Sequence, residues 1–233
     1  MTTYKNIKGI EIKYLSADPP APNAGQVWYN STTKVVKGAI NGVGAWASGG
    51  NLSTARGSGS SIGIQDASLF VGGENPLTTP SVFALNESYN GTSWTELADL
   101  NTARQGAVGS GTQTAGIVAG GTTPSRLEVE SWNGSSWSEV NELNVGRKNA
   151  HSFLGGLQTA SLFISGVTNP PSTTSAAVES YNGTSWTEIA DVNTSRRQFA
   201  GAGTQTSALI SGGGATTNVE SWNSTSWTET TEL

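Results

Sequence analysis

Four arginines recur at one fixed distance from a tryptophan, and they are the side chains best suited to binding an anion. Each arginine follows its tryptophan by ten residues: Trp46 and Arg56, Trp94 and Arg104, Trp137 and Arg147, Trp186 and Arg196. A ring of guanidinium groups could hold an anionic ligand, because this planar group matches carboxylate and phosphate. A constant offset is more typical of framework residues. We therefore expect these groups to bridge loops or to stack on indole rings, with their alkyl stems covering apolar surface.

A second series consists of glutamines, which lie in the turn before a predicted innermost strand. The glutamine follows the tryptophan by 19 residues in three repeats and by 21 in the other, at Gln65, Gln113, Gln158 and Gln205. Several amide oxygens near one end of a central channel could bind a polar ligand or an ion. Alternatively, the amides bond to backbone groups of the turns. The sequence leaves both roles open.

Groups for acid, base or metal chemistry are sparse. His151 is the only histidine and the chain has no cysteine, so neither a thiolate site nor a paired-imidazole site can form. Glu96 with Asp99, and Glu188 with Asp191, recur in one frame and are expected to be solvated carboxylates at strand ends. No nucleophile elbow, calcium loop or phosphate-binding glycine loop occurs. The sequence therefore predicts no cofactor, no metal and no enzymatic activity.

An octapeptide that occurs four times organises the chain: Glu87–Trp94, Glu130–Trp137, Glu179–Trp186 and Glu220–Trp227. Each copy is a predicted β-hairpin, in which an aromatic residue closes one strand, an Asn-Gly or Asn-Ser turn follows, and a tryptophan opens the next strand. These tryptophans, Trp227 included, could form a platform for sugars. Burying an indole removes about 150–250 Å² of side-chain surface from water. Because this burial is stabilising, packing between neighbouring sheets is the favoured role.

Two further strands complete each repeat, an apolar strand ending in Gly-Gly and a strand of small residues after the arginine. Four short antiparallel strands in about 40–50 residues are typical of a propeller blade. The order arginine, small strand, apolar strand, Gly-Gly, Glu-x-aromatic, turn and tryptophan resembles the kelch repeat over residues 46–233. The third repeat departs from this pattern at Ser165, which replaces the first glycine of its pair.

The number of strands indicates how the ring closes. The last repeat ends six residues after Trp227 and lacks its fourth strand, whereas residues 7–15 form a surplus strand near the N-terminus. We therefore predict an all-β fold, a five-bladed kelch-like β-propeller of four-stranded blades in a single domain, 1–233, with the N-terminal strand closing the last blade. Its predicted parts are a closing strand and linker, 1–25, and the blades 26–64, 65–111, 113–155, 158–203 and 208–233 plus 7–15. The alternative is four blades with residues 1–45 as a separate N-terminal anchor.

Composition narrows the class of partner. Charged residues make up 12% of the 233 residues, and the net charge is −5 without any run of lysine or arginine. Nucleic-acid backbones require clustered cations, so we expect no nucleic-acid partner. No apolar run approaches membrane-spanning length, and the N-terminal stretch has no apolar core of an export signal. We therefore expect neither membrane insertion nor classical export.

Repeat length varies mainly between the Gly-Gly pair and the next repeated glutamate. In repeat proteins such insertions map to loops on one face, which is often the binding face. The variable segments are 74–86, 122–129, 167–178 and 214–219. The candidate binding residues on them are Asn75, Thr78, Thr79, Thr123, Arg126, Thr168, Asn169 and Thr173.

The nearly uncharged, near-identical repeats, rich in Ser, Thr, Gly and Asn, resemble kelch-like proteins common in marine bacteriophage genomes. The stretch YLSADPPAPNAGQVWYNSTT is similar to segments of phage tail-fibre and virion-surface proteins. This resemblance implies a non-enzymatic virion component, either a tail-fibre or receptor-binding module or a surface decoration. The implied location is the virion, assembled in the host cytoplasm. The implied partners are other virion proteins of the capsid or tail, a host cell-surface glycan, and further copies of the chain in a homo-oligomer.

Two other functions stay open, an intracellular kelch-type scaffold that binds a protein and a propeller glycosidase or lyase. Proteins with kelch repeats include galactose oxidase, but its copper cofactor requires cysteine and paired histidines, which this chain lacks. The Ser-x-Asp-x-Gly-x-x-Trp box of sialidases does not occur in the sequence either.

Overall fold

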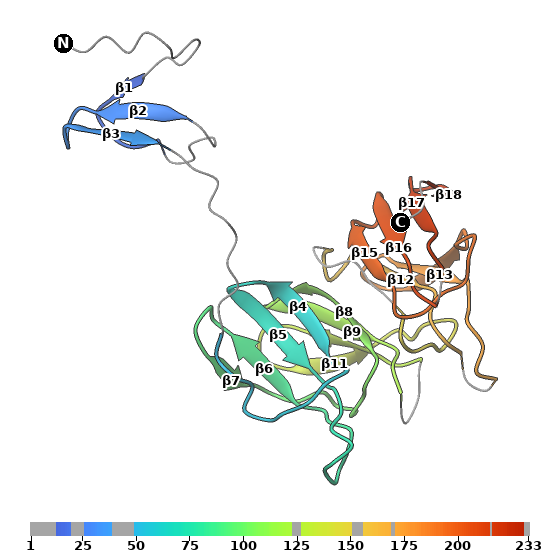
Figure 1. The fold of residues 1–233 in the computed structure, drawn as a ribbon. Coiled ribbons are helices and arrows are strands. Elements are labelled where there is room, and N and C mark those ends of the chain that lie inside the picture. Colours follow the sequence, from blue (N-terminus) through green and yellow to red (C-terminus); the bar gives the residue numbers. More distant parts are fainter. Residues whose placement is uncertain are drawn as a thin grey trace. The chain divides into compact units, whose positions relative to one another are not determined.

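The protein is all-β, as its composition predicts. The computed structural model describes residues 13–19, 26–38, 49–122, 127–150, 156–168, 171–214 and 216–230. Within these ranges every regular element is a β-strand, and no helix is present that could cross a membrane. The chain divides into two compact units, Met1–Ser48 and Gly49–Leu233, where the sequence analysis expects one domain. Figure 1 labels the strands of both units.

The N-terminal unit contains a three-stranded sheet of β1 (Lys13–Leu15), β2 (Val27–Asn30) and β3 (Val35–Gly38). β1 pairs in parallel with β2, and β2 forms an antiparallel hairpin with β3. Asp18 ties the segment after β1 to this hairpin, because its carboxylate accepts hydrogen bonds from Trp28 Nε1 and Asn30 Nδ2, both at 2.9 Å. Bonds from Lys37, Asn30 and Trp28 lower the pKa of Asp18 to about 2.

This pairing corrects the predicted role of the N-terminal strand. The prediction that residues 7–15 close the last sheet is wrong for the part that the structure describes, since Lys13–Leu15 pairs with β2. Residues 7–12 lie outside the described residues. The physical reason is local: Ser31 N–H donates to Leu15 O at 2.8 Å, and Thr32 Oγ1 donates to Ser16 O at 2.6 Å. The nearby hairpin thus satisfies the backbone that was expected to pair with a distant sheet.

The described strands of the second unit form four sheets, each in sequence order with antiparallel neighbours. Sheet 1 contains β4 (Ser60–Ile64), β5 (Ala67–Val71), β6 (Asn86–Tyr89) and β7 (Trp94–Glu96); sheet 2 contains β8 (Val108–Thr112), β9 (Ala115–Ala119), β10 (Val129–Trp132) and β11 (Trp137–Val140). Sheet 3 contains β12 (Ser161–Ile164), β13 (Val178–Tyr181) and β14 (Trp186–Ile189); sheet 4 contains β15 (Ala200–Gly203), β16 (Ala208–Ser211), β17 (Val219–Trp222) and β18 (Trp227–Glu229).

The repeated octapeptide forms the predicted hairpin in every sheet. Its aromatic residue pairs directly with its tryptophan, as Tyr89 with Trp94 and Tyr181 with Trp186. The asparagine of the turn accepts two backbone bonds; Asn90 Oδ1, for example, receives Thr92 N–H at 3.0 Å and Ser93 N–H at 2.9 Å. The Asx turn therefore fixes the register of each hairpin.

The small-residue strand belongs to a different sheet from the one predicted. β8 pairs with β9, which follows it, and not with β7, which precedes it. The predicted blades 26–64, 65–111, 113–155, 158–203 and 208–233 plus 7–15 are therefore displaced by one strand. Only Gln113 and Thr114 separate β8 from β9, and so short a connection joins antiparallel neighbours. Sheet 4 already has four strands without the N-terminal segment, which fits the alternative of four repeats plus a separate N-terminal part.

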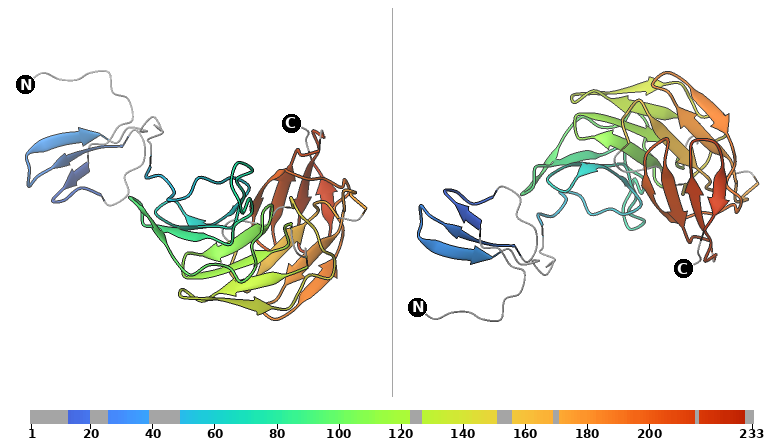
Figure 2. Two further views of the ribbon diagram at one scale, coloured as in Figure 1. Left: turned by 90° about the horizontal axis from the view of Figure 1, so that it is seen from below. Right: turned by 90° about the horizontal axis from the view of Figure 1, so that it is seen from above.

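The core of this unit lies between successive sheets. One apolar cluster joins Leu69 of sheet 1 to Val118 and Trp137 of sheet 2. A second cluster joins sheets 2 and 3, and a third joins sheets 3 and 4. In both views of Figure 2 these sheets follow one another in chain order, from teal through green and orange to red. Each sheet is therefore stabilised by the next sheet along the chain.

The second glycine of each Gly-Gly pair is fixed by a close backbone approach. Gly166 has φ 105°, and a Cβ there would lie 2.8 Å from Lys148 O. The departure at Ser165 is compatible with this turn, although Ser165 also has a positive φ of 54°. Its hydroxyl lies 2.6 Å from Ser175 O and accepts the Arg196 N–H at 2.8 Å. These bonds offset the strain that a glycine would avoid.

Candidate functional site

All four arginines of the series are buried and form ion pairs with the repeated glutamates. The pairs are Arg56–Glu87, Arg104–Glu130, Arg147–Glu179 and Arg196–Glu220. Their side chains are at most 2% exposed. A buried charge requires a partner, and here the partner comes from the first strand of the octapeptide hairpin in the same sheet.

Arg147 shows how completely the guanidinium group is used. Its Nη2 donates to Glu179 Oε1 at 2.7 Å, and its Nη1 donates to Ser165 O at 3.0 Å and to Ala177 O. The group also lies over the Phe163 ring, 4.8 Å from its centroid. Burial lowers the pKa of Arg147, and the Glu179 carboxylate opposes this shift. These contacts leave the group no free face for an external anion.

The arginines also connect neighbouring sheets. The Arg104 backbone bonds to the loops of sheet 1, where its N–H donates to Phe83 O at 3.1 Å and its carbonyl accepts the Gly73 N–H at 2.9 Å. Its side chain bonds to sheet 2, including Glu128 O at 2.9 Å. Arg104 thus connects two sheets through its backbone and its side chain together. The rings beneath two of the guanidinium groups are Phe70 and Phe163 rather than indoles.

The glutamate partners were missed by sequence reasoning, although their spacing offered a signal. Each stands seven residues before a tryptophan in all four copies of the octapeptide. Glu179 also accepts the Asn144 backbone N–H at 2.7 Å and its side-chain amide at 2.8 Å. Burial would raise the pKa of Glu87, but hydrogen bonds from Arg56 and Ser53 outweigh burial, and the pKa is lowered. A carboxylate recurring in the same frame as an arginine therefore indicates an internal ion pair.

Four members of the repeated tryptophan series lie in the described residues, and three of these four lie between sheets. Trp137, Trp186 and Trp227 are buried in the three apolar clusters. Trp94 is only half-buried, and its Nε1 donates to Gly50 O at 3.0 Å. Trp46 lies outside the described residues. None of the three buried indoles offers a free aromatic face to a sugar.

The glutamines bond to the hairpin of the preceding sheet. Gln158 Nε2 donates to Ser131 Oγ at 2.8 Å, Trp132 O at 2.6 Å and Gly116 O at 2.8 Å. Gln113 and Gln205 make the equivalent bonds. This arrangement supports the backbone-bonding role over the ligand-binding role for these three residues.

The predicted binding residues that the structure describes lie on the loops that precede the octapeptide hairpins. Thr78, Thr79 and Thr173 are exposed. Asn75 Nδ2 donates to Ala55 O at 3.1 Å, and the hydroxyls of Thr168 and Thr173 lie 2.9 Å apart. The remaining three residues lie outside the described ones: Thr123, Arg126 and Asn169. The structure therefore places the described members at one end of the sheets, on different loops.

We call this end of the sheets the variable-loop pole. A polar cavity of about 230 Å³ lies there. Its lining residues are Ser58, Glu74, Gln105, Gly106, Thr122, Lys148, Asn149 and Gln198. Antiparallel strands alternate in direction, so the loops after second strands share an end with the starts of the first strands. Glu74 and Lys148 bring opposite charges to the lining. Sequence reasoning missed this cavity, although four of its residues stand two positions after an arginine of the series.

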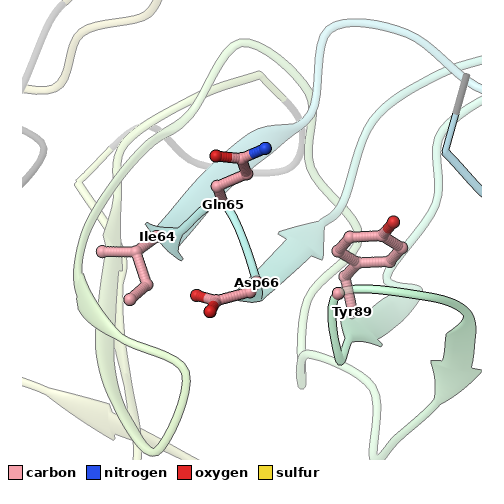
Figure 3. A pocket seen from close by; sticks show the side chains of 5 residues that line it. Ile64, Gln65, Asp66 and Tyr89 are labelled. Atoms are coloured by element: carbon pink, nitrogen blue, oxygen red, sulfur yellow. The ribbon is translucent and has the colours of Figure 1, made fainter. Parts of the chain in front are cut away.

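Two cavities lie at the opposite end and share Ile64. One, of about 520 Å³, is lined by Ile64, Gln65, Asp66, Tyr89 and Gly91, and Figure 3 shows these side chains around an open space. The other, of about 530 Å³, includes Leu157 and the turn between β8 and β9. Leu157 and Ile64 are 63% and 68% exposed, so this end presents apolar surface.

Groups for metal or acid–base chemistry do not converge in the described part of the chain. No cluster of three His, Cys, Asp or Glu side chains that could hold a metal occurs there. Glu96, Asp99, Glu188 and Asp191 are exposed, as the sequence analysis expects. His151 lies outside the described residues.

Comparisons with known proteins bear on the fold alone. No protein-family model matches the chain, and no curated protein matches it. A solved structure titled "Structure of YjhT" is similar, with a TM-score of 0.63 and 16% sequence identity over 85% of this chain and 74% of that chain. In all, 164 chains of solved structures match, so the fold is widely shared and does not by itself specify a function.

Proposed function

We propose that the sheets of Gly49–Leu233 are blades of a kelch-like β-propeller, and that the protein is a non-enzymatic binding module of a bacteriophage virion. Support for the propeller comes from sheets that repeat one strand order and pack in series. The similarity of the fold to a solved structure at a TM-score of 0.63 adds to it. Support for the virion comes from the phage-like N-terminal stretch and from repeats with few charged residues.

One observation carries the binding role: the repeated Arg–Glu pairs are enclosed within the sheets, and the described residues of the variable loops present mainly hydroxyls and amides to solvent. Arg147 and Glu179 are both 0% exposed, whereas Thr78 and Thr173 are open to solvent. Neutral hydroxyl and amide groups can exchange hydrogen bonds with sugar hydroxyls or with the backbone of another protein. Leu77, which is 93% exposed in the same loop as Thr78, adds an apolar anchor for either partner.

Variation in loop length supports the variable-loop pole as the binding surface. The frame of arginine, glutamate and tryptophan keeps its spacing, while the loops 74–86, 122–129, 167–178 and 214–219 differ in length. A rigid scaffold that carries variable loops is the usual arrangement of a binding surface. The ligand is therefore a host cell-surface glycan or a capsid or tail subunit that meets these loops together.

The test compares two exposed threonines at opposite ends of sheet 1. Thr78→Lys alters the variable-loop pole, and Thr92→Lys places the same charge in the β6–β7 turn. We expect the first variant to lose binding to host cells and to a glycan array at unchanged stability, while the second retains it. Equal binding by both variants, or hydrolysis of any offered glycan by the wild type, would overturn the proposal. Mass spectrometry of purified phage particles tests the virion assignment separately.

A further inference from the structure

Successive sheets meet through one repeated set of contacts. We call the face of a sheet that meets the preceding sheet its N-side face, and the face that meets the following sheet its C-side face. Three junctions are present, between sheets 1 and 2, 2 and 3, and 3 and 4. The N-side face of sheet 1 and the C-side face of sheet 4 have no such junction in the described residues.

The first repeated contact is the glutamine amide. Gln113, Gln158 and Gln205 each donate from the N-side face to a serine hydroxyl and an aromatic carbonyl of the preceding sheet. Gln65 occupies the same position in sheet 1, but it is exposed, and its amide makes no corresponding hydrogen bond to a described residue. Its amide stands at the open cavity in Figure 3. The matching acceptors on sheet 4, Ser221 Oγ and Trp222 O, receive no glutamine.

The second repeated contact joins a glycine N–H to the carbonyl of the next arginine. These bonds run from Gly73 to Arg104 at 2.9 Å, from Gly121 to Arg147 at 3.0 Å and from Gly166 to Arg196 at 2.9 Å. Gly213 is the equivalent glycine of sheet 4, and its N–H has no such acceptor. Arg56 is the equivalent arginine of sheet 1, and its carbonyl has no such donor.

The third repeated contact is a chain of backbone bonds at the polar cavity. Gly106 N–H donates to Ser58 O at 2.8 Å, Asn149 N–H to Gly106 O at 2.9 Å, and Gln198 N–H to Asn149 O at 3.2 Å. This chain stops at both ends in the described part of the unit, because Ser58 N–H and Gln198 O make no bond of this kind. In all three contacts, a hydrogen-bonding group without its partner on sheet 1 therefore matches a complementary group without its partner on sheet 4.

The exposure of equivalent side chains also differs between the internal junctions and the two ends of the array. Leu69, Ile117 and Leu162 occupy one repeat position on the C-side face and are 0%, 2% and 1% exposed, whereas Leu209 at that position in sheet 4 is 47% exposed. On the N-side face, Tyr181 and Trp222 are 4% and 5% exposed. The equivalent Tyr89 of sheet 1 is only half-buried and lines the open cavity of Figure 3.

We propose that the C-side face of sheet 4 binds the N-side face of sheet 1 in a second copy of this chain. Three sets of hydrogen-bonding groups and one apolar position match those of the junctions inside the chain, so this contact continues an interface that already exists. In the described residues of one chain, sheets 1 and 4 share none of these backbone bonds.

Such a contact is heterologous, because it joins different faces of two identical chains. Heterologous contacts produce closed rings when the rotation between copies permits closure and open filaments when it does not. One residue makes this contact weaker than the internal ones: Ser211 stands where Val71, Ala119 and Ile164 stand in the other sheets. We therefore expect a reversible association that depends on concentration. The inference concerns the ends of the array and does not depend on the ligand of the variable-loop pole.

Cysteine cross-linking tests the geometry, because the chain has no cysteine of its own. Gln65→Cys and Ser221→Cys are prepared separately in the full chain, mixed, and treated with a short bismaleimide. We expect a cross-linked dimer in the mixture, and far less when either variant is treated alone or when exposed Asp99→Cys replaces Gln65→Cys. A doubly substituted chain that becomes linked within itself would show that the ends of one array meet each other. That result would overturn the proposal, as would a mixture that gives no more dimer than the Asp99 control.

A second measurement uses the exposed leucine and a matched control. Leu209→Asp and Leu77→Asp each place a carboxylate at an exposed apolar side chain, so neither substitution opens a buried cavity. In sedimentation experiments we expect the wild-type chain of 24.0 kDa and Leu77→Asp to form larger species as concentration rises, while Leu209→Asp stays monomeric. A wild type that remains monomeric at every concentration would contradict the proposal. Loss of ligand binding in Leu77→Asp with retained self-association would separate this inference from the proposed function.

Discussion

The middle of the array and its two ends contain the same residues in different surroundings. Leu162 and Leu209 occupy equivalent positions, yet one is 1% exposed and the other 47%. Gln158 donates three hydrogen bonds to sheet 2, while the Gln65 amide makes none to the described residues. The difference arises from whether a neighbouring sheet is present, since the local sequence is nearly the same. In a repeat fold, a residue's contribution to stability is therefore set by its neighbour as much as by its own sheet.

The largest expected effect lies inside a repeat, at the buried ion pair of sheet 3. Glu179→Gln removes the charge that Arg147 faces and leaves a buried cation uncompensated, which costs about 3–5 kcal/mol. Glu188 lies directly across the β13–β14 pair from Glu179 and is exposed. Glu188→Gln is therefore a matched control that should change the free energy of unfolding by less than about 0.5 kcal/mol. Urea denaturation checks both variants, and equal small effects would contradict the role of the buried pair.

The tryptophans give the next largest contrast. Trp137→Ala removes a buried indole between sheets 1 and 2 and should cost about 3–5 kcal/mol. Its Nε1 has no hydrogen-bond partner, so the cost reflects packing alone. Trp94→Ala at the half-buried end position should cost clearly less. If thermal melting shows Trp94→Ala to be as damaging as Trp137→Ala, the N-side face of sheet 1 is already covered within one chain.

The glutamines compare the same two regions, with a smaller expected change in the free energy of unfolding. Gln158→Ala leaves buried acceptors on sheet 2 without their donor and should lower the free energy of unfolding by about 1–2 kcal/mol. Gln65→Ala removes an amide that bonds to nothing and should have almost no effect in dilute solution. Chemical denaturation at a concentration where the chain is monomeric measures both values. A comparable loss in the two variants would mean that Gln65 has a partner.

The pH dependence gives the smallest of these effects. The pKa of Glu87 is lowered from its ordinary value of 4.5, so the folded chain holds this proton less tightly than the unfolded chain. The contribution of Glu87 to stability is therefore complete above pH 4.5 and is lost as the pH falls through the lower pKa of the folded state. Urea midpoints of the wild type and Glu87→Gln should converge as the solution is acidified through this range. Midpoints that stay equally far apart would exclude the ionised pair as the source of the difference.

The sequence predicts the elements of the fold better than their pairing. Asn-Gly turns and flanking aromatic residues predict every hairpin, because a two-strand turn is determined locally. Which sheet the small-residue strand joins depends instead on the length of its connections. In sheet 1, only Gln65 and Asp66 separate β4 from β5, and this short link makes the two strands neighbours. Counting from the arginines placed that strand in the preceding sheet. The N-terminal strand was misplaced for a similar reason, since its nearest partner, β2, was not weighed against a distant one.

The candidate site was predictable only in part. The spacing of the arginines predicts a framework role, but their partners become visible only when Glu179 and its counterparts are brought across the sheet by pairing. The loop residues Thr78 and Thr173 were assigned from length variation alone, and they do lie at one pole. The polar cavity beside them depends on backbone positions such as Gly106, whose surroundings no sequence pattern specifies.

Amide hydrogen exchange at the repeated glycines tests most directly whether the ends of the array are unfilled junctions. Gly73, Gly121 and Gly166 each donate to the next arginine, so their N–H groups should be protected at every protein concentration. The Gly213 N–H should exchange rapidly in dilute solution and become protected as the chain is concentrated. A Gly213 amide that is protected as strongly as Gly166 in dilute solution, or one that stays unprotected at all concentrations, would contradict the account.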